Sequence, residues 1–132
     1  MLKNKKIALY VTGGIAVYKV VDLMRSFIKN GAQVRVAMTD SATKFVTPMT
    51  FQILSRHEVY VDTFSENNPA HVSHVDLSDW ADISIVAPAT ANTIGKMAYG
   101  LADNFVTSAL LATASPIFVV PAMNTDMFEN PA

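Results

Sequence analysis

The sequence predicts an α/β fold, a three-layer, doubly wound parallel sheet, built as a single domain over residues 1–132. Short apolar runs rich in β-branched residues alternate with longer segments whose apolar residues recur at helical spacing. Turns of small and polar residues separate the two kinds of segment, as they do in right-handed βαβ units. A chain of this length can also bury one hydrophobic core.

The first βαβ unit is predicted from residues 6 to 38. An apolar strand over Lys6–Val11 precedes a turn of small residues and a helix over about Ile15–Asn30. Asn30-Gly31 is a C-terminal cap signal, and alternating apolar residues predict a second strand over Gln33–Met38. The helix is indicated by apolar residues at helical spacing: Val17, Val20, Val21, Met24, Phe27 and Ile28.

The middle of the chain is less regular. We expect a turn and short helix over 39–45, and a helix over Pro48–Leu54 because proline suits the start of a helix. Val59–Val61 is a candidate third strand, since its residues favour extended backbone. The stretch 65–73 contains Asn67-Asn68-Pro69, which predicts an irregular loop.

Regular alternation returns in the last third. Apolar runs predict strands over Ile83–Ala87 and Ile117–Val120. Two helices are expected between them, over Ala91–Tyr99 and 103–114, and Gly100 separates the two. In an open parallel sheet of this kind, ligands bind at the edge formed by the carboxyl ends of the strands.

Composition narrows the function classes. Half of the residues are hydrophobic (51%) and few are charged (16%), which argues against disorder and suggests apolar surface covered by other subunits. A net charge of −1 gives no support to nucleic-acid or anionic-membrane binding. With no apolar run of membrane-spanning length and no signal sequence, we expect a cytoplasmic protein. Without cysteine, the chain has no disulfides, thiolate catalysis or Cys-based zinc site, and we predict no metal site.

The turn after the first strand is a candidate phosphate site. Gly13, Gly14 and Ile15 stand where backbone N–H groups at a helix start would point toward an anion, and glycine permits close approach. The turn matches neither the Gly-x-Gly-x-x-Gly fingerprint nor a P-loop. A tight turn without a ligand is therefore an equally good interpretation of these residues alone.

Two further turns would meet the first at the same edge. Thr39 and Ser41 could offer hydroxyls to a ligand, although helix capping by Thr39 or Asp40 explains them as well. The turn Thr90-Ala91-Asn92-Thr93 combines small and polar residues, and its alternative interpretation is again a capped strand-to-helix turn. Three such turns at one edge indicate a ligand site better than any single turn does.

His74 and Asn124 are the remaining candidates for chemistry. An imidazole exchanges protons near neutral pH, but a lone histidine is more often structural, which applies also to His57 and His71. Asn124 follows the last predicted strand and offers both an amide donor and a carbonyl acceptor, although a turn-forming role is common for asparagine there. Phe45 is more often a core residue than one that stacks on a ring.

Taken together, these motifs resemble the homo-oligomeric flavin-containing cysteine decarboxylases. The residues Pro121-Ala122-Met123-Asn124-Thr125-Asp126-Met127 match the family signature Pro-x-Met-Asn-x-x-Met. Matches to Thr-Gly-Ser/Gly-Ile/Val-Ala, His-Ile/Val-x-Leu and Trp-Ala-Asp precede it in family order, and the resemblance spans Ile7–Met127. Residues 100–104 resemble the family element Gly-x-x-Asp/Asn-Asn, although Asp103 is better explained as the N-cap of the next helix.

The resemblance implies a Rossmann-like flavoprotein fold, FMN as cofactor, and a role for each candidate. His74 would be the acid–base residue and Asn124 the residue that contacts the substrate carboxylate. The implied FMN contacts are Gly13, Gly14, Ile15, Thr39, Ser41, Phe45, Thr90, Ala91, Asn92, Thr93 and Ala122.

Within this family, the motifs are most like those of phosphopantothenoylcysteine decarboxylase of coenzyme A synthesis. That resemblance implies oxidation of the substrate cysteine by FMN, loss of carbon dioxide, and return of the electrons to give 4′-phosphopantetheine. It also implies a trimer or dodecamer with FMN between subunits. A peptidyl-cysteine decarboxylase of lantibiotic maturation and a non-catalytic flavin-fold regulatory module are the alternatives.

Family members continue past the Asn124 motif with another strand and a flap that carries a cysteine. Since this sequence has no cysteine and only a short predicted sheet, we expect a C-terminally truncated fragment.

Overall fold

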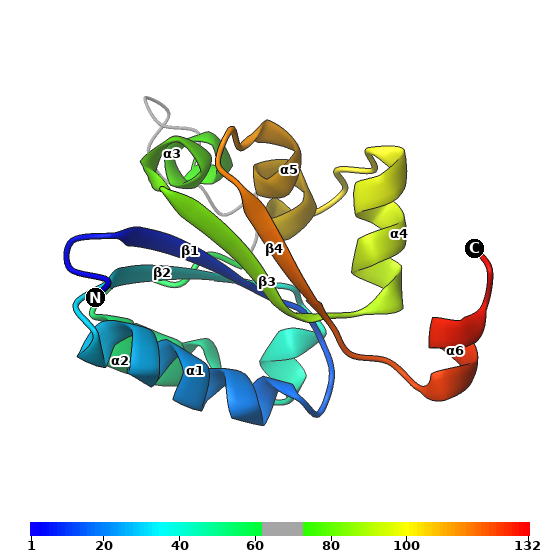
Figure 1. The fold of residues 1–132 in the computed structure, drawn as a ribbon, viewed down its shortest axis with the longest axis horizontal. Coiled ribbons are helices and arrows are strands. Elements are labelled where there is room, and N and C mark those ends of the chain that lie inside the picture. The colour runs from blue at the N-terminus through cyan, green and yellow to red at the C-terminus, as the bar shows by residue number, and fades with distance from the viewer. Residues whose placement is uncertain (62–72) are drawn as a thin grey trace.

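A parallel sheet with helices on both faces forms the centre of the molecule (Figure 1). The structure is a computed structural model, and it describes residues 1–61 and 73–132. The sheet has four strands in the order β2-β1-β3-β4, all of them parallel. The strands are β1 Lys6–Val11, β2 Gln33–Met38, β3 Ile83–Ala89 and β4 Ile117–Pro121.

The helices form the two outer layers (Figure 1). One layer contains α1 and α2, and the other contains α3, α4 and α5, so the predicted three-layer architecture is confirmed. Their bounds are α1 Val17–Lys29, η1 Ala42–Lys44, α2 Pro48–Ser55, α3 Ser73–Trp80, α4 Ala91–Tyr99, α5 Phe105–Ala112 and α6 Thr125–Glu129.

Strand β1 lies between two hydrophobic cores. Successive side chains of a strand point to opposite faces, so Ile7, Leu9 and Val11 pack with α1 and α2, whereas Ala8 and Tyr10 pack with α3 and α5. This burial on both faces explains why the strand is continuously apolar in sequence.

The buried face and the C-terminal end of α1 follow from its sequence. Its buried residues Val17, Val20 and Met24 recur at helical spacing, as predicted. The helix ends at Lys29, and Gly31 takes the left-handed conformation with φ +97° that the Asn30-Gly31 signal predicts.

The predicted strand over Val59–Val61 is wrong in extent. Only Tyr60 pairs with β2: its N–H donates to the Val36 carbonyl at 3.0 Å, and its carbonyl accepts from the Met38 N–H at 2.8 Å. Within residues 59–61, only Tyr60 meets the edge of the sheet at β2. The preference of Val59 and Val61 for extended backbone therefore produces no ladder of hydrogen bonds there. The predicted loop over 65–73 lies mostly outside the described residues, and Ser73 belongs to α3.

The start of α5 also differs from the prediction. Asn104, not Asp103, is the N-cap: its side-chain oxygen accepts the Thr107 N–H at 2.8 Å, and the Thr107 hydroxyl accepts the Asn104 N–H at 3.1 Å. This reciprocal capping box fixes the first helical residue as Phe105.

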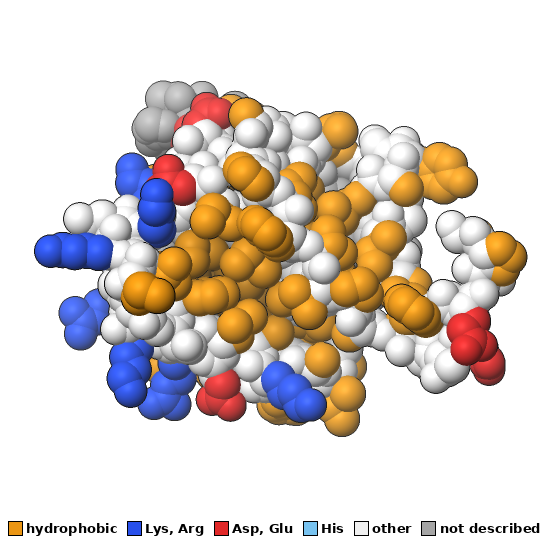
Figure 2. All heavy atoms as spheres, viewed as in Figure 1, with side chains coloured by type: hydrophobic (Ala, Val, Ile, Leu, Met, Phe, Trp, Pro, Cys, Tyr) orange, Lys and Arg blue, Asp and Glu red, His pale blue; other side chains and the backbone are white. Residues whose placement is uncertain are grey.

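Strand β4 is an apolar strand at the open edge of the sheet. All of its residues are exposed, and the side chain of Phe118 is 58% exposed. Figure 2 shows hydrophobic side chains gathered across the middle of this face of the molecule. Among the described residues, no helix has the length and apolar character needed to cross a bilayer.

The core packing of α2 predicts a large difference between two of its residues. Phe51 is fully buried against the sheet, whereas Ile53 is 68% exposed. We expect Phe51→Ala to lower the free energy of unfolding by about 3–5 kcal/mol, and the matched control Ile53→Ala to change it by less than about 0.5 kcal/mol. Urea unfolding followed by circular dichroism measures both. Equal losses in the two variants would contradict this packing.

Candidate active site

The candidate site lies where the connections of the sheet change direction. From β1 the chain passes through α1 to β2 on one side, whereas β3 lies on the other side of β1 and leads through α4 and α5 to β4. The turns that follow β1 and β3 therefore diverge and leave a crevice at the carboxyl edge of the sheet, which is the usual ligand position in such folds.

Thr12 joins these two turns. Its hydroxyl donates to the carbonyl of Pro88 and accepts the N–H of Thr90 at 2.9 Å. The backbone N–H of Thr12 also donates to the Pro88 carbonyl, at 3.3 Å. Because Thr12 is fully buried, these bonds fix the start of the β1–α1 turn against the start of α4.

Gly13 brings the β1–α1 turn against the turn after β2. A Cβ atom at Gly13 would lie 2.4 Å from the Cβ of Ser41 and 3.0 Å from its carbonyl carbon. Only a residue without a side chain permits this approach. The second turn is itself fixed, because the Thr39 hydroxyl accepts the N–H of Ala42 at 3.2 Å.

Thr90 has two roles, since it caps α4 and also lines the site. Its hydroxyl accepts the N–H of Thr93 at 3.2 Å, as expected for an N-cap. The same turn presents Asn92 and Thr93 toward the crevice. The two interpretations of this turn left open by the sequence are therefore compatible.

Between these turns lies a cleft of about 460 Å³. This volume is within the range of about 300–1,000 Å³ typical of small-molecule sites. Hydroxyl, amide and backbone groups dominate its walls, which suits a polar, phosphate-bearing ligand. The described lining residues are Gly13, Thr39, Asp40, Ser41, Val61, Thr90, Asn92, Thr93, Lys96, Asp103 and Asn104.

The cleft includes some of the predicted cofactor residues and not others. Gly13, Thr39, Ser41, Thr90, Asn92 and Thr93 line it, and their contact with a cofactor stays a prediction. The predicted contacts that do not line it are Gly14, Ile15, Phe45, Ala91 and Ala122. Ile15 is 78% exposed, and the position of Gly14 has open space around it, so the first turn faces outward beyond Gly13.

Sequence reasoning missed Lys96 as a lining residue. The Lys96 ammonium lies 3.0 Å from a carboxylate oxygen of Asp103, and both residues line the cleft. Lys96 follows Asn92 by four residues on α4, so both lie on one helical face. That spacing was the available signal, and it needed only the assignment of α4 as a helix.

His74 lies in the first turn of α3, beside α5. Its ring meets Phe105 edge to face, with centroids 6.2 Å apart and planes at 89°. Phe105 also stacks on Tyr60, with centroids 5.0 Å apart. Phe105 directly follows the cleft residue Asn104, and His74 itself is not one of the described lining residues.

A second contact holds the helix that carries His74. The buried hydroxyl of Ser78 lies 2.7 Å from the carbonyl oxygens of both His74 and Ala109, and so joins α3 to α5. Burial raises the pKa of the nearby Tyr10 to about 12, although the hydroxyls of Ser84 and Ser78 act in the opposite direction. The phenol of Tyr10 therefore stays neutral near neutral pH.

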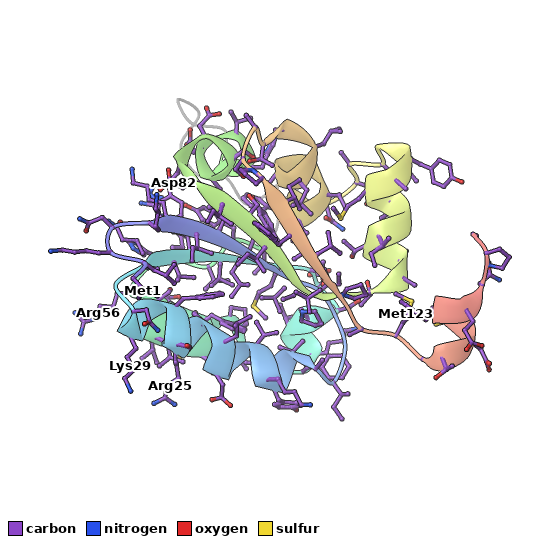
Figure 3. The ribbon with its side chains drawn as sticks, viewed as in Figure 1. Met1, Arg25, Lys29, Arg56, Asp82 and Met123 are labelled. Atoms are coloured by element: carbon purple, nitrogen blue, oxygen red, sulfur yellow. The ribbon has the colours of Figure 1, made fainter. Side chains whose placement is uncertain are left out.

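Asn124 lies after β4, as the N-cap of α6. Its side-chain oxygen caps α6 by accepting the Met127 N–H at 2.9 Å, so the turn-forming role holds. Helix α6 extends away from the sheet, and α3 lies at the opposite side of the view (Figure 1). Figure 3 shows the neighbouring Met123 on the same extension. Within one chain, α3, which carries His74, and α6, which Asn124 caps, are therefore separate elements on opposite sides of the view in Figure 1.

No arrangement of three His, Cys, Asp or Glu side chains suited to a metal ion occurs within residues 1–61 and 73–132.

His57 lies after α2. Its pKa is lowered mainly by burial and to a smaller extent by the positive charge of Arg35.

Comparison with known proteins assigns the chain to a family. The sequence profile named Flavoprotein matches residues 1–132. The chain belongs to the Flavoprotein family. This Flavoprotein chain is 56% identical, over its whole length, to the "Coenzyme A biosynthesis bifunctional protein CoaBC" of Bacillus subtilis. It is 46% identical, over 97% of its length, to the "Probable phosphopantothenoylcysteine decarboxylase" of Streptococcus mutans.

Solved structures agree with the Flavoprotein assignment. The FMN-dependent cysteine decarboxylase SpaF superposes with a TM-score of 0.90 at 27% identity, over 99% of this chain and 75% of its own. A PPC decarboxylase mutant complexed with pantothenoylaminoethenethiol superposes with a TM-score of 0.82 at 35% identity, over 98% and 72%. The Flavoprotein chain spans about a third of CoaBC (32%) and 73% of the Streptococcus relative.

The close approach at Gly13 gives a prediction with an internal control. We expect Gly13→Ala to lower the free energy of unfolding by about 1–3 kcal/mol, because the added methyl group overlaps Ser41. Gly14→Ala places its methyl group in open space and should not lower stability. Urea denaturation of both variants makes the comparison. A Gly13→Ala variant as stable as Gly14→Ala would show that the two turns are not in contact.

Proposed function

We propose that this protein is an FMN-dependent decarboxylase that converts 4′-phosphopantothenoylcysteine to 4′-phosphopantetheine in coenzyme A biosynthesis. The observation that supports this proposal most is the cleft at the switch point, whose turns after β1, β2 and β3 supply hydroxyls, the Asn92 amide and Gly13, which has no side chain and so lets two of these turns meet. The coenzyme A enzymes named among the relatives support the choice of substrate. The cytoplasmic location expected from the sequence is part of the proposal.

The residues of the cleft suit FMN. The Thr39 and Ser41 hydroxyls would bind phosphate oxygens beside the Gly13 turn, and Thr90, Asn92 and Thr93 would hold the remaining polar groups. Bound FMN would supply the two-electron redox chemistry, while the protein supplies position and proton transfer.

His74 would transfer the proton. Its ring is held by Phe105, and its helix is joined to α5 through Ser78, so the imidazole has a defined position. Asn124 would anchor the substrate carboxylate through its amide N–H groups, while its side-chain oxygen caps α6. A cap of this kind fixes the side chain before substrate arrives, which reduces the entropic cost of binding.

The separation of α3 from α6 supports a site shared between subunits. If both His74 and Asn124 act on one substrate, we expect them to come from different copies of the chain, because α3 and α6 lie on opposite sides of one copy (Figure 1). The exposed apolar residues of β4 provide a surface that association would cover. We therefore include in the proposal a homo-oligomer, either a trimer or a dodecamer, with FMN between subunits.

Turnover by the complete gene product tests the catalytic roles. We expect the parent protein to be yellow with bound FMN and to release carbon dioxide from phosphopantothenoylcysteine. His74→Asn and Asn124→Asp should keep FMN and lose about 10²–10⁴-fold in rate, through loss of a proton carrier and through charge repulsion respectively. His57→Asn is the matched control and should keep parental turnover. Near-parental rates for His74→Asn and Asn124→Asp would show that both residues are structural.

The same assay separates the alternative functions. Turnover of a peptide ending in cysteine, with none of phosphopantothenoylcysteine, would identify a peptidyl-cysteine decarboxylase. FMN binding with turnover of neither substrate would identify a regulatory module.

Complementation tests the shared site. We expect co-expressed His74→Asn and Asn124→Asp chains to recover activity that neither variant has alone, since mixed oligomers contain sites with both intact residues. In a randomly mixed cyclic oligomer, about one quarter of the sites would be intact. Light scattering should report a mass several times that of the chain. A monomer, or mixed oligomers as inactive as the single variants, would refute the shared site.

A further inference from the structure

Lys96 has a distinct electrostatic place in the cleft. Along the described part of the lining, it is the one residue with a positive charge, whereas Asp40 and Asp103 are acidic. The formal charge of this lining is therefore one negative, and it would be two negative without Lys96. The carboxylates of Asp40 and Asp103 would repel the phosphate of a bound ligand. Among the described lining residues, only Lys96 can offset that repulsion.

The structure holds the Lys96 side chain in a defined position. Its ammonium lies 3.0 Å from an Asp103 carboxylate oxygen, and its side chain is only 22% exposed. The same side chain borders a second cavity of about 140 Å³, whose lining includes Met97, Leu101 and Leu110. The aliphatic stem thus lies along apolar residues while the ammonium reaches the polar cleft, the common arrangement of a half-buried lysine.

The backbone around Lys96 is equally fixed. Its carbonyl accepts the N–H of Leu101 at 2.9 Å, where the chain turns through Gly100 with φ +69°. Asp103 follows that turn and precedes the capping box at Asn104. The ion pair therefore connects the face of α4 that lines the cleft to the segment before α5, through a half-buried lysine and a carboxylate that is 61% exposed.

We propose that Lys96 is a specificity-determining residue that recognises the negative charge of the bound flavin nucleotide, and that Asp103 positions its ammonium. This inference rests on the proposed binding of FMN and deepens it. FMN has negative charge on its phosphate and gains further negative charge on its ring system when it is reduced. A fixed cation in a partly dehydrated cleft interacts with such charge more strongly than a solvated surface lysine does.

Flavin titration of the complete gene product tests the proposal without reference to turnover. Lys96→Met keeps the length of the side chain and removes its charge, and it should weaken FMN binding by about tenfold or more, as expected for loss of a charged contact. Lys96→Arg retains the charge and should bind within about threefold of the parent. Lys29→Met makes the same charge change at the exposed end of α1 (Figure 3) and should bind as the parent does.

Riboflavin and redox state identify which charge Lys96 recognises. Weaker binding of FMN, with riboflavin binding unchanged, would assign Lys96 to the phosphate. Weaker binding of both flavins, with a larger loss in the reduced state and a lower midpoint potential, would assign it to the ring system. Either result supports the proposal.

Two results would overturn the proposal. One is parental affinity of Lys96→Met for FMN in both redox states. The other is an equal loss of FMN affinity in Lys29→Met, which would show that the effect comes from the net charge of the protein and not from the position of Lys96. A parent protein that binds no flavin would instead refute the proposed function, and this inference with it.

Discussion

The hydrogen bonds of Thr12 hold together the two turns on which the candidate site is built. Strands β1 and β3 pair in parallel as neighbours, but the chain leaves them toward opposite faces of the sheet. The buried Thr12 hydroxyl closes this divergence by bonding to Pro88 and Thr90. A valine would have a similar shape and leave the Thr90 N–H without this partner, at a cost of about 1–3 kcal/mol, whereas the Pro88 carbonyl would still accept the backbone N–H of Thr12. The crevice can therefore open only beyond Thr12.

The other walls of the cleft follow from this fixed point. The Gly13 turn is positioned by its neighbour Thr12, and its lack of a side chain admits the turn after β2 to contact distance. On the far side, the cap at Thr90 aims α4 so that Asn92, Thr93 and Lys96 share the face toward the cleft. Backbone capping and the proposed FMN binding would thus use the same hydroxyl-rich turns, because an orphan N–H group and a phosphate oxygen both require a hydrogen-bond partner.

The single chain contains the cleft proposed for FMN, but it carries the two proposed catalytic residues on separate elements. His74 is fixed against α5 by ring packing and by Ser78, while Asn124 lies on an exposed extension that follows an exposed edge strand. Apolar β-branched residues at a sheet edge are costly to leave in water and invite association. The proposed shared site would use this property of the surface, since covering β4 and completing the catalytic set would be one event.

The sequence by itself determined the elements whose signals are local. Apolar periodicity located β1, α1 and β2, and small or polar turns after each strand located Gly13, Ser41 and Thr90. The motif order around His74 and Asn124 was sufficient to indicate the Flavoprotein family, because residue identity in order is a property of the chain alone.

Only the tertiary structure decided which of these residues share a surface. It placed Gly14 and Ile15 outside the cleft, and it brought in Lys96 from the second turn of α4. It reduced the expected strand at Val59–Val61 to a single bridge and gave the cap of α5 to Asn104. The reason is that sequence patterns record the period of an element, whereas the direction in which a side chain points depends on how packing rotates that element against its neighbours.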